Sequence, residues 1–147
     1  MGRRASANAP DAAREPPLIA FIDTNVIVRH LTGDPPDQAA KATAALASGE
    51  ALLLTDLVLA ECVYVLESFY EVPPARVAEL MRAAIALPNL KTVDEAILIR
   101  SLEIYELDRL DFAEAYLAAQ AEATGVGEVL SFDRSIDRLT TVRRREP

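Results

Sequence analysis

The sequence predicts an α/β fold, in which a parallel sheet is covered by helices on both faces to form a single-domain α/β/α sandwich. Short apolar runs that suit buried strands alternate with longer segments of helical periodicity, which is the pattern of strand–helix–strand units. The chain has 147 residues, a usual size for one domain. Hydrophobic residues make up 51% of it, which is enough for a packed core.

In the first half of the chain, apolar runs predict strands at residues 18–22 and 51–55. A short helix is expected at 25–31. Asp34 and Pro35 are typical of a helix start, and Gly49 ends that helix. Asp56 begins another helix that runs to about residue 70.

In the second half, Pro73 and Pro74 begin a helix that ends near Pro88, and helices are expected at about 94–107 and 112–124. Strands are predicted at 90–93 and 128–132, with a last edge strand at 139–142. We therefore divide the chain into a flexible tail at 1–17, a domain at 18–142 and a basic C-terminal tail at 143–147.

Composition excludes several classes of protein. No run of about 20 apolar residues is present to span a membrane, and the first residues lack the apolar stretch of a secretory signal. A single cysteine, Cys62, excludes a disulfide framework and a zinc–cysteine cluster, so we expect a reducing, cytoplasmic location. A net charge of −8 opposes nucleic-acid binding, so any such function must account for the carboxylates.

Two acidic residues follow predicted strands directly. Asp23 comes after the strand at 18–22, and Asp133 comes after the strand at 128–132. Ligand sites of open α/β sheets lie beyond the carboxyl ends of strands, so both carboxylates are expected on one rim of the sheet. The alternative for either residue is a simple helix cap.

Glu61 lies within an apolar helical pattern formed by Val58, Cys62, Val65 and Phe69. On that pattern its side chain is expected to turn toward the interior. An unpaired buried carboxylate costs several kcal/mol, so it needs a bound cation, a proton or an arginine partner. The sequence leaves these three alternatives open.

Asp111 and Glu114 are three residues apart at the start of a predicted helix and therefore share one face. Taken alone, they are a cap and a first-turn acid stabilised by the helix dipole. Taken with the other acids, they complete a cluster whose mutual repulsion calls for a cation. Oxygen ligands without His or Cys suit Mg²⁺ or Mn²⁺ rather than zinc.

Four segments, in order along residues 18–142, resemble the PIN-domain ribonucleases and, among these, the VapC-type toxins of type II toxin–antitoxin pairs. They are Phe21–Val26 (FIDTNV), Thr55–Glu61 (TDLVLAE), Leu110–Ala119 (LDFAEAYLAA) and Ser131–Asp133 (SFD). The resemblance implies a PIN-like fold. It also implies an Mg²⁺- or Mn²⁺-dependent endoribonuclease acting on single-stranded or structured RNA, a homodimer, and a cognate antitoxin protein as partner.

The same resemblance assigns roles to particular residues. It implies that the catalytic acids and metal ligands are Asp23, Glu61, Glu114 and Asp133, with Asp111 as a further metal ligand and Asn25 in support. One position departs from the family, which usually has Asp where this chain has Glu114. The longer side chain changes where a metal would sit or leaves more of the ligation to Asp111.

Two other functions stay open at this point. A haloacid-dehalogenase-type phosphohydrolase also begins with a strand that ends in Asp, but it needs a second Asp two residues later, where this chain has Asn25. A binding module that keeps the PIN fold without efficient turnover is the other alternative. Glu114 is the feature that favours it.

Overall fold

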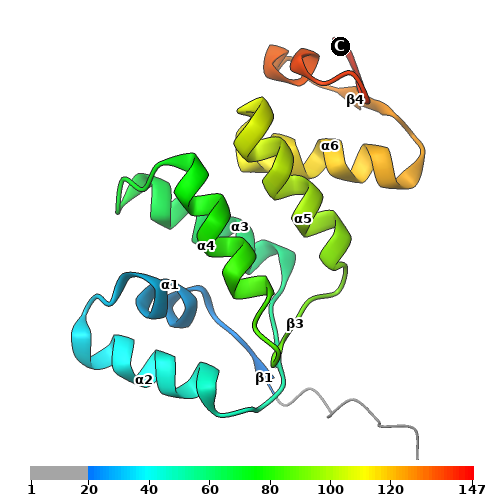
Figure 1. Ribbon diagram of the computed structural model, residues 1–147. Helices are drawn as coiled ribbons and strands as arrows, with labels where there is room; N and C mark the ends of the chain where they lie inside the picture. Colours follow the sequence, from blue (N-terminus) through cyan, green and yellow to red (C-terminus); the bar gives the residue numbers. More distant parts are fainter. Residues whose placement is uncertain (1–19) are drawn as a thin grey trace, which may run out of the picture.

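The structure, a computed structural model, describes residues 20–147 (Figure 1). The tail predicted at 1–17 and the first residues of the predicted strand at 18–22 lie outside the described residues. The first sheet has the order β1-β2-β3 and contains β1 (Ala20–Phe21), β2 (Leu52–Leu53) and β3 (Leu90–Lys91). All its strands are parallel, with Ala20 opposite Leu52 and Leu52 opposite Leu90. The prediction of an α/β fold with parallel strands is confirmed.

Helices connect these strands, and their ends follow local sequence signals. They are α1 (Thr24–Thr32), α2 (Pro36–Ala47), α3 (Asp56–Ser68) and α4 (Pro74–Ile85). Thr55 caps α3 by accepting a hydrogen bond from the Val58 amide at 3.2 Å. Asp34 was predicted to cap α2. Instead Pro35 holds the cap position, and the Asp34 carboxylate accepts a hydrogen bond from the Tyr70 hydroxyl at 3.1 Å.

The second half of the chain forms α5 (Glu95–Glu103), the π-helical turn η1 (Ile104–Asp108) and α6 (Phe112–Thr124). After them come β4 (Glu128–Leu130), the 3₁₀ turn η2 (Arg134–Arg138) and β5 (Arg143–Arg145). Asp94 caps α5 through the Ile97 amide at 3.2 Å. Gly125 ends α6 in the left-handed conformation that a helix C-terminus favours.

The last strand is not where the sequence predicted it. It lies at Arg143–Arg145, in the segment expected to be a basic tail, rather than at 139–142. Leu139 and Val142 are buried in the core, so their apolar character reflects packing and not strand pairing. Arg143 and Arg145 both pair with Glu128 on β4, which holds this strand in place.

The strands form two separate sheets instead of one. β4 pairs with β5 in parallel and belongs to a two-stranded sheet of its own. Figure 1 shows β1 and β3 at one end of the molecule and β4 at the other, with α3, α4, α5 and α6 between them. The rim on which Asp23 and Asp133 were expected to meet is therefore divided.

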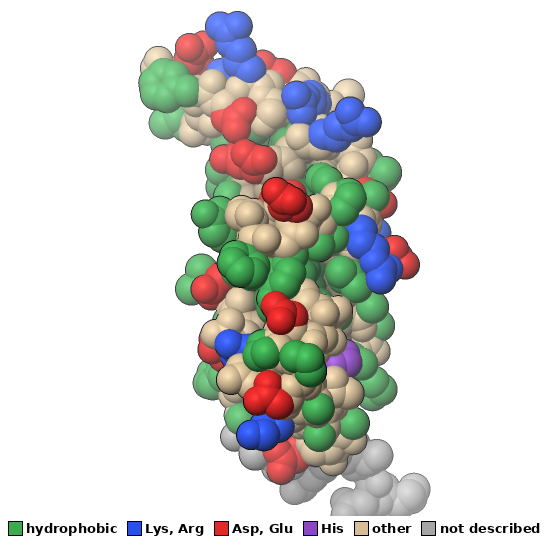
Figure 2. Space-filling model, turned by 90° about the vertical axis from the view of Figure 1, so that its left-hand side faces the viewer, with side chains coloured by type: hydrophobic (Ala, Val, Ile, Leu, Met, Phe, Trp, Pro, Cys, Tyr) green, Lys and Arg blue, Asp and Glu red, His purple; other side chains and the backbone are tan. Residues whose placement is uncertain are grey.

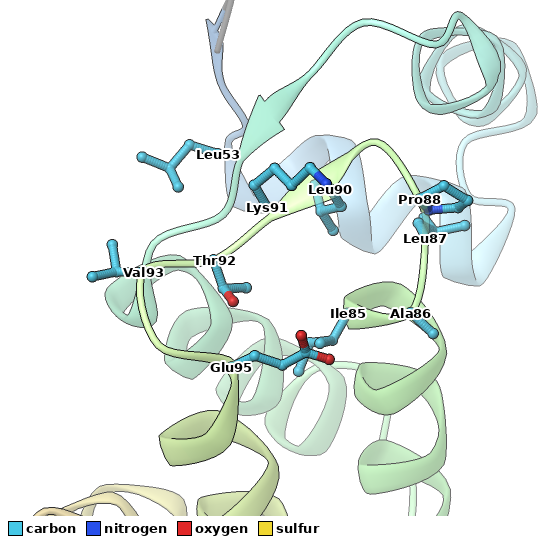
Figure 3. A pocket seen from close by; sticks show the side chains of 10 residues that line it. All are labelled: Leu53, Ile85, Ala86, Leu87, Pro88, Leu90, Lys91, Thr92, Val93 and Glu95. Atoms are coloured by element: carbon cyan, nitrogen blue, oxygen red, sulfur yellow. The ribbon is translucent and has the colours of Figure 1, made fainter. Parts of the chain in front are cut away.

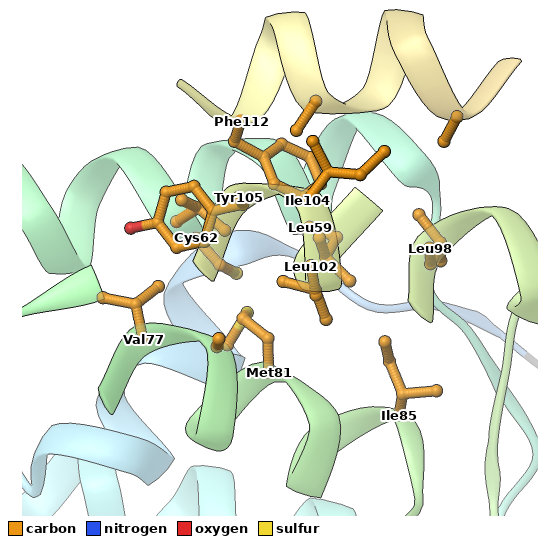
Figure 4. Packing of buried hydrophobic residues seen from close by; sticks show 14 of the residues in the cluster. Leu59, Cys62, Val77, Met81, Ile85, Leu98, Leu102, Ile104, Tyr105 and Phe112 are labelled. Carbon is orange, nitrogen blue, oxygen red and sulfur yellow. The ribbon is translucent and has the colours of Figure 1, made fainter. Parts of the chain in front are cut away.

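One hydrophobic cluster joins the two halves of the chain. Side chains from α3, α4, α5, η1 and α6 converge there, including Leu59, Met81, Leu98 and Phe112 (Figure 4). Ile136 of η2 belongs to the same cluster and is 0% exposed. The C-terminal elements are thus packed firmly against their own chain.

Candidate functional site

The first part of the candidate site lies just after β1. The Ile22 amide donates to the Leu53 carbonyl at 3.0 Å, which fixes the end of β1, and Asp23 follows as an exposed residue. Thr24 begins α1 and is only 4% exposed. Its hydroxyl donates a 2.7 Å hydrogen bond to Oε2 of Glu61 on α3. The structure therefore brings Asp23 and Glu61 into one region and orients the Glu61 carboxylate through Thr24.

The environment of Glu61 differs from the prediction. The face that α3 buries consists of Leu59, Cys62, Val63 and Leu66. The expected pattern placed Phe69 inside, but Phe69 is 75% exposed, and Glu61 is exposed as well. The buried stripe is turned relative to the predicted one. Glu61 consequently needs neither a proton nor an arginine to offset burial.

Cys62 of α3 lies near both of these carboxylates. Its thiol is buried and its Sγ lies 4.0 Å from the Thr24 carbonyl oxygen. Burial, with the negative charges of Glu61 and Asp23, raises the pKa of the thiol to about 12. Asp23 and Glu61 are therefore both near enough to Cys62 to affect the pKa of its thiol.

The second part of the site is the start of α6. Asp111 is exposed, Glu114 is partly buried, and the Phe112 ring between them is buried in the core. Glu114 and Asp111 line a cavity of about 460 Å³ opposite Ala60 and Tyr64 of α3. The start of α6 thus faces the same helix that carries Glu61.

Tyr116 joins α6 to α3 more directly. Its hydroxyl donates to Oδ2 of Asp56, the first residue of α3, at 2.5 Å. That hydrogen bond and burial raise the pKa of the Tyr116 hydroxyl. The sequence analysis did not single out Tyr116. The available signal was its position in the segment Leu110–Ala119, two residues after Glu114.

Asp133 lies elsewhere, between β4 and η2. Its carboxylate accepts a hydrogen bond from the Ser135 amide at 2.9 Å and so caps η2. Hydrogen bonds from Ser135, followed by the charges of Arg138 and Arg144, lower the pKa of Asp133. In the single chain Asp133 therefore caps η2, and its role as a metal ligand stays a prediction.

The predicted acids do not converge within one chain. In residues 20–147, no group of three or more Asp, Glu, His or Cys side chains lies close enough to hold a metal ion. Figure 2 shows Asp and Glu side chains spread down one face of the molecule from top to bottom. The oxygen ligands suit Mg²⁺ chemically. Their placement in the single chain does not fit one bound ion.

Most arginines near Asp133 are engaged by acidic neighbours. Arg144 donates to Asp137 at 3.0 and 3.1 Å, and Arg145 donates to Glu128 at 2.5 Å. The hydrogen bonds from Arg143 and Arg145 hold the pKa of Glu128 below its ordinary value. These arginines therefore stabilise the second sheet, and their charges are already offset by acidic neighbours.

A cavity of about 630 Å³ lies at the edge of the first sheet formed by β3 (Figure 3). Lys91 and Glu95 are the charged residues in its lining, which otherwise consists mainly of apolar side chains such as Leu53 and Ile85. None of the candidate acids lines it. We therefore do not include this cavity in the candidate site.

Comparison with known proteins identifies the family. The sequence model of the PIN domain matches residues 20–141, and the chain belongs to the PIN-domain family. A comparison with curated proteins gives no match. Among solved structures, the chain is similar to a chain of VapBC2 from Rickettsia felis, crystallised bound to a DNA fragment from their promoter. The two are 15% identical, the TM-score is 0.34, and the match covers 86% of this chain and 97% of that one.

The family match favours the PIN alternative over a haloacid-dehalogenase-type enzyme, and it spans all four segments that carried the resemblance. None of the helices in residues 20–147 has both the length and the apolar content needed to cross a membrane.

Proposed function

We propose that this protein is a metal-dependent endoribonuclease that hydrolyses phosphodiester bonds of single-stranded or structured RNA and serves as the toxin of a VapBC-type toxin–antitoxin pair. The PIN-domain match over residues 20–141 is the observation that supports this most strongly. The proposed catalytic acids are Asp23, Glu61, Glu114 and Asp133, with Asp111 and Asn25 in support. Mg²⁺ or Mn²⁺ is the proposed cofactor, and a cognate antitoxin is the proposed partner in the cytoplasm.

The region after β1 supports the roles of two of these acids. Thr24 is buried and holds the exposed Glu61 carboxylate by a 2.7 Å hydrogen bond, close to Asp23. Such a pair repels a phosphate unless a cation lies between them. A divalent cation, when bound, would offset this repulsion and supply an activated water. Thr24 would hold the Glu61 carboxylate in place toward such a cation.

A catalytically weak PIN-fold binding module is a second candidate. The separation of Asp133 from Asp23 in the single chain favours it, as does Glu114 in place of the family's usual Asp. The two candidates differ in whether the protein cleaves RNA with a divalent ion, which one experiment decides.

The test uses labelled single-stranded RNA and a transfer RNA, incubated with the protein and Mg²⁺, Mn²⁺ or EDTA. We expect cleavage with either ion and none with EDTA. Asp23→Asn should lower the rate by about 100-fold or more, because loss of even a supporting contact to a metal ligand costs about 10–100-fold. Asp37→Asn, an exposed change on α2, is the matched control and should cleave at the wild-type rate. Absent cleavage by the folded wild type, or equal cleavage by Asp23→Asn, contradicts the enzyme proposal.

A further inference from the structure

The first sheet has an open edge along β1. In residues 20–147, β1 pairs with β2 on one side and with no strand on the other. Both its residues are exposed, and Phe21 is 73% exposed although it is a large aromatic side chain. Parallel strands are usually covered on both faces, and an open strand edge presents unpaired N–H and C=O groups that can pair with another chain. A further strand can therefore pair with the open edge of β1.

The second sheet has a matching open edge along β4. There β4 pairs only with β5, and Leu130 of β4 is 55% exposed. Beside it, Leu117, Val126 and Val129 line an apolar hollow of about 290 Å³ between α6 and β4. An aromatic side chain such as Phe21 has the shape and polarity to fill this hollow.

The β4 of a chain cannot turn to meet its own β1 without losing contacts that anchor it. Ile136 is fully buried against the helices, and Arg138 donates to the Arg109 carbonyl at 2.8 Å. Thr141 donates to Glu122 on α6 at 2.5 Å. These contacts keep the second sheet where Figure 1 shows it, at the end of the molecule opposite β1.

We propose that a second copy of this chain supplies the missing strand, so that β4 of each copy pairs in parallel with β1 of the other. Because the two open edges lie at opposite ends of the chain, one two-fold axis between the copies would bring both pairs together at once. Each copy alone has a three-stranded and a two-stranded sheet. In the pair of copies, these would join into two continuous five-stranded sheets.

This pairing would also complete the site, and in that respect it rests on the proposed function. Asp23 follows β1 and Asp133 follows β4, so a parallel pairing would place both residues beyond the carboxyl ends of neighbouring strands. Thr24 keeps Glu61 near Asp23, and α6, which carries Glu114, is held to α3 of the same chain through Tyr116 and Asp56. Each site would therefore take Asp133 from one copy and the other three acids from its partner.

A cross-linking experiment tests the pairing without any need for nuclease activity. Phe21→Cys is made in one chain and Leu130→Cys in a second chain that carries a size tag. Both positions are exposed, so neither change should unfold the protein. The mixed chains are treated with a short bismaleimide linker, which tolerates a shift of strand register, and are separated on a denaturing gel. Native Cys62 is 0% exposed and should remain unmodified.

We expect a linked band that contains one tagged and one untagged chain. Val93→Cys replaces Phe21→Cys in the control, because Val93 is 79% exposed but follows β3 at the other edge of the sheet. That control should give no linked band. Absence of the mixed band with Phe21→Cys overturns the proposal. So does a doubly substituted chain, carrying both Phe21→Cys and Leu130→Cys, that links only within itself.

Mixing inactive variants then tests the shared site. Asp23→Asn and Asp133→Asn chains, each inactive alone, should recover about one quarter of the wild-type rate when mixed, because half of the pairs hold one intact site. Asp23→Asn mixed with Glu114→Gln should recover nothing. If the cross-link forms and the wild type cleaves no RNA, the pairing stands and the proposed nuclease function fails. If the wild type cleaves RNA and no cross-link forms, the function stands and the pairing fails.

Discussion

At the scale of single residues, the hydrogen bond between Thr24 and Glu61 is the contact that joins the first two sequence motifs, Phe21–Val26 and Thr55–Glu61. It joins residues 37 positions apart and fixes the carboxylate of an otherwise exposed side chain. The position of Asp23 just after β1 was predictable, because it follows an apolar run of strand length. The partnership of Thr24 with Glu61 was not, because it depends on how α1 packs against α3.

Thr24→Val should lower RNA cleavage by about 10–100-fold, the usual cost of losing a contact that orients a metal ligand. The valine keeps the volume of the side chain but cannot donate to Glu61. Steady-state rates are measured over a range of Mn²⁺ concentrations, and we expect the variant to need more metal for half-maximal rate.

Thr24→Ser is the matched control for that experiment, because serine retains the hydroxyl. It should restore most of the rate and the wild-type metal requirement. If Thr24→Ser is as impaired as Thr24→Val, Thr24 acts through packing and does not position Glu61.

At the scale of elements, caps and turn residues made most helices predictable. Asp56, Pro74 and Gly125 mark helix ends within a residue or two of the observed bounds. The strand at 139–142 was wrong because apolar character alone cannot separate a strand from a buried loop. The position of the last strand depends instead on the pairing of Arg143 and Arg145 with Glu128, which lies 15 and 17 residues away in the sequence.

The junction of α5, α6 and the loop before β5 depends on one ionic cluster. Arg100 donates to both carboxylate oxygens of Glu122 at 2.9 Å, and Thr141 donates to the same group. The Arg100 hydrogen bonds hold the pKa of Glu122 below its ordinary value of 4.5. A folded pKa below the unfolded one stabilises the protein above pH 4.5, and this contribution is lost as the pH falls.

Glu122→Gln should therefore lower the free energy of unfolding by about 1–2 kcal/mol at pH 7, because a charge-assisted bidentate pair is replaced by weaker hydrogen bonds. The difference between wild type and variant should shrink as the pH falls below about 4.5, which urea unfolding at pH 7 and pH 3.5 measures.

Glu79→Gln provides the comparison for Glu122→Gln. Its side chain is 68% exposed and pairs with Arg76 at 3.0 Å, so its loss should cost less than about 1 kcal/mol. Equal losses for the two variants, or a Glu122→Gln effect that is independent of pH, would show that the ionic cluster does not hold this junction.

At the scale of the whole molecule, the parallel strands and the PIN family were predictable, but the division into two sheets was not. Local patterns specify that β1 and β4 are strands. They do not specify whether these two strands pair with each other in one chain, because that depends on long-range contacts such as those of Ile136 and Arg138. For the same reason, local patterns alone could not predict that Asp23 and Asp133 lie apart in the single chain.

The net charge of −8 also acts on the molecule as a whole. Its carboxylates are spread over the surface, as Figure 2 shows for one face, so their repulsion is long-range and is screened by salt. We expect the free energy of unfolding, measured with urea, to rise by about 1 kcal/mol or less between low salt and about 0.5 M NaCl.

Glu50→Lys tests whether repulsion is the cause of that rise. Glu50 is exposed, and the substitution makes the net charge less negative, so the variant should be more stable at low salt and respond less to added salt. Surface ion pairs such as Arg82–Glu106, at 2.6 Å, act in the opposite direction, because salt weakens them. If added NaCl lowers the stability of the wild type, these pairs outweigh the net repulsion, and the acidic surface costs the fold less than its charge indicates.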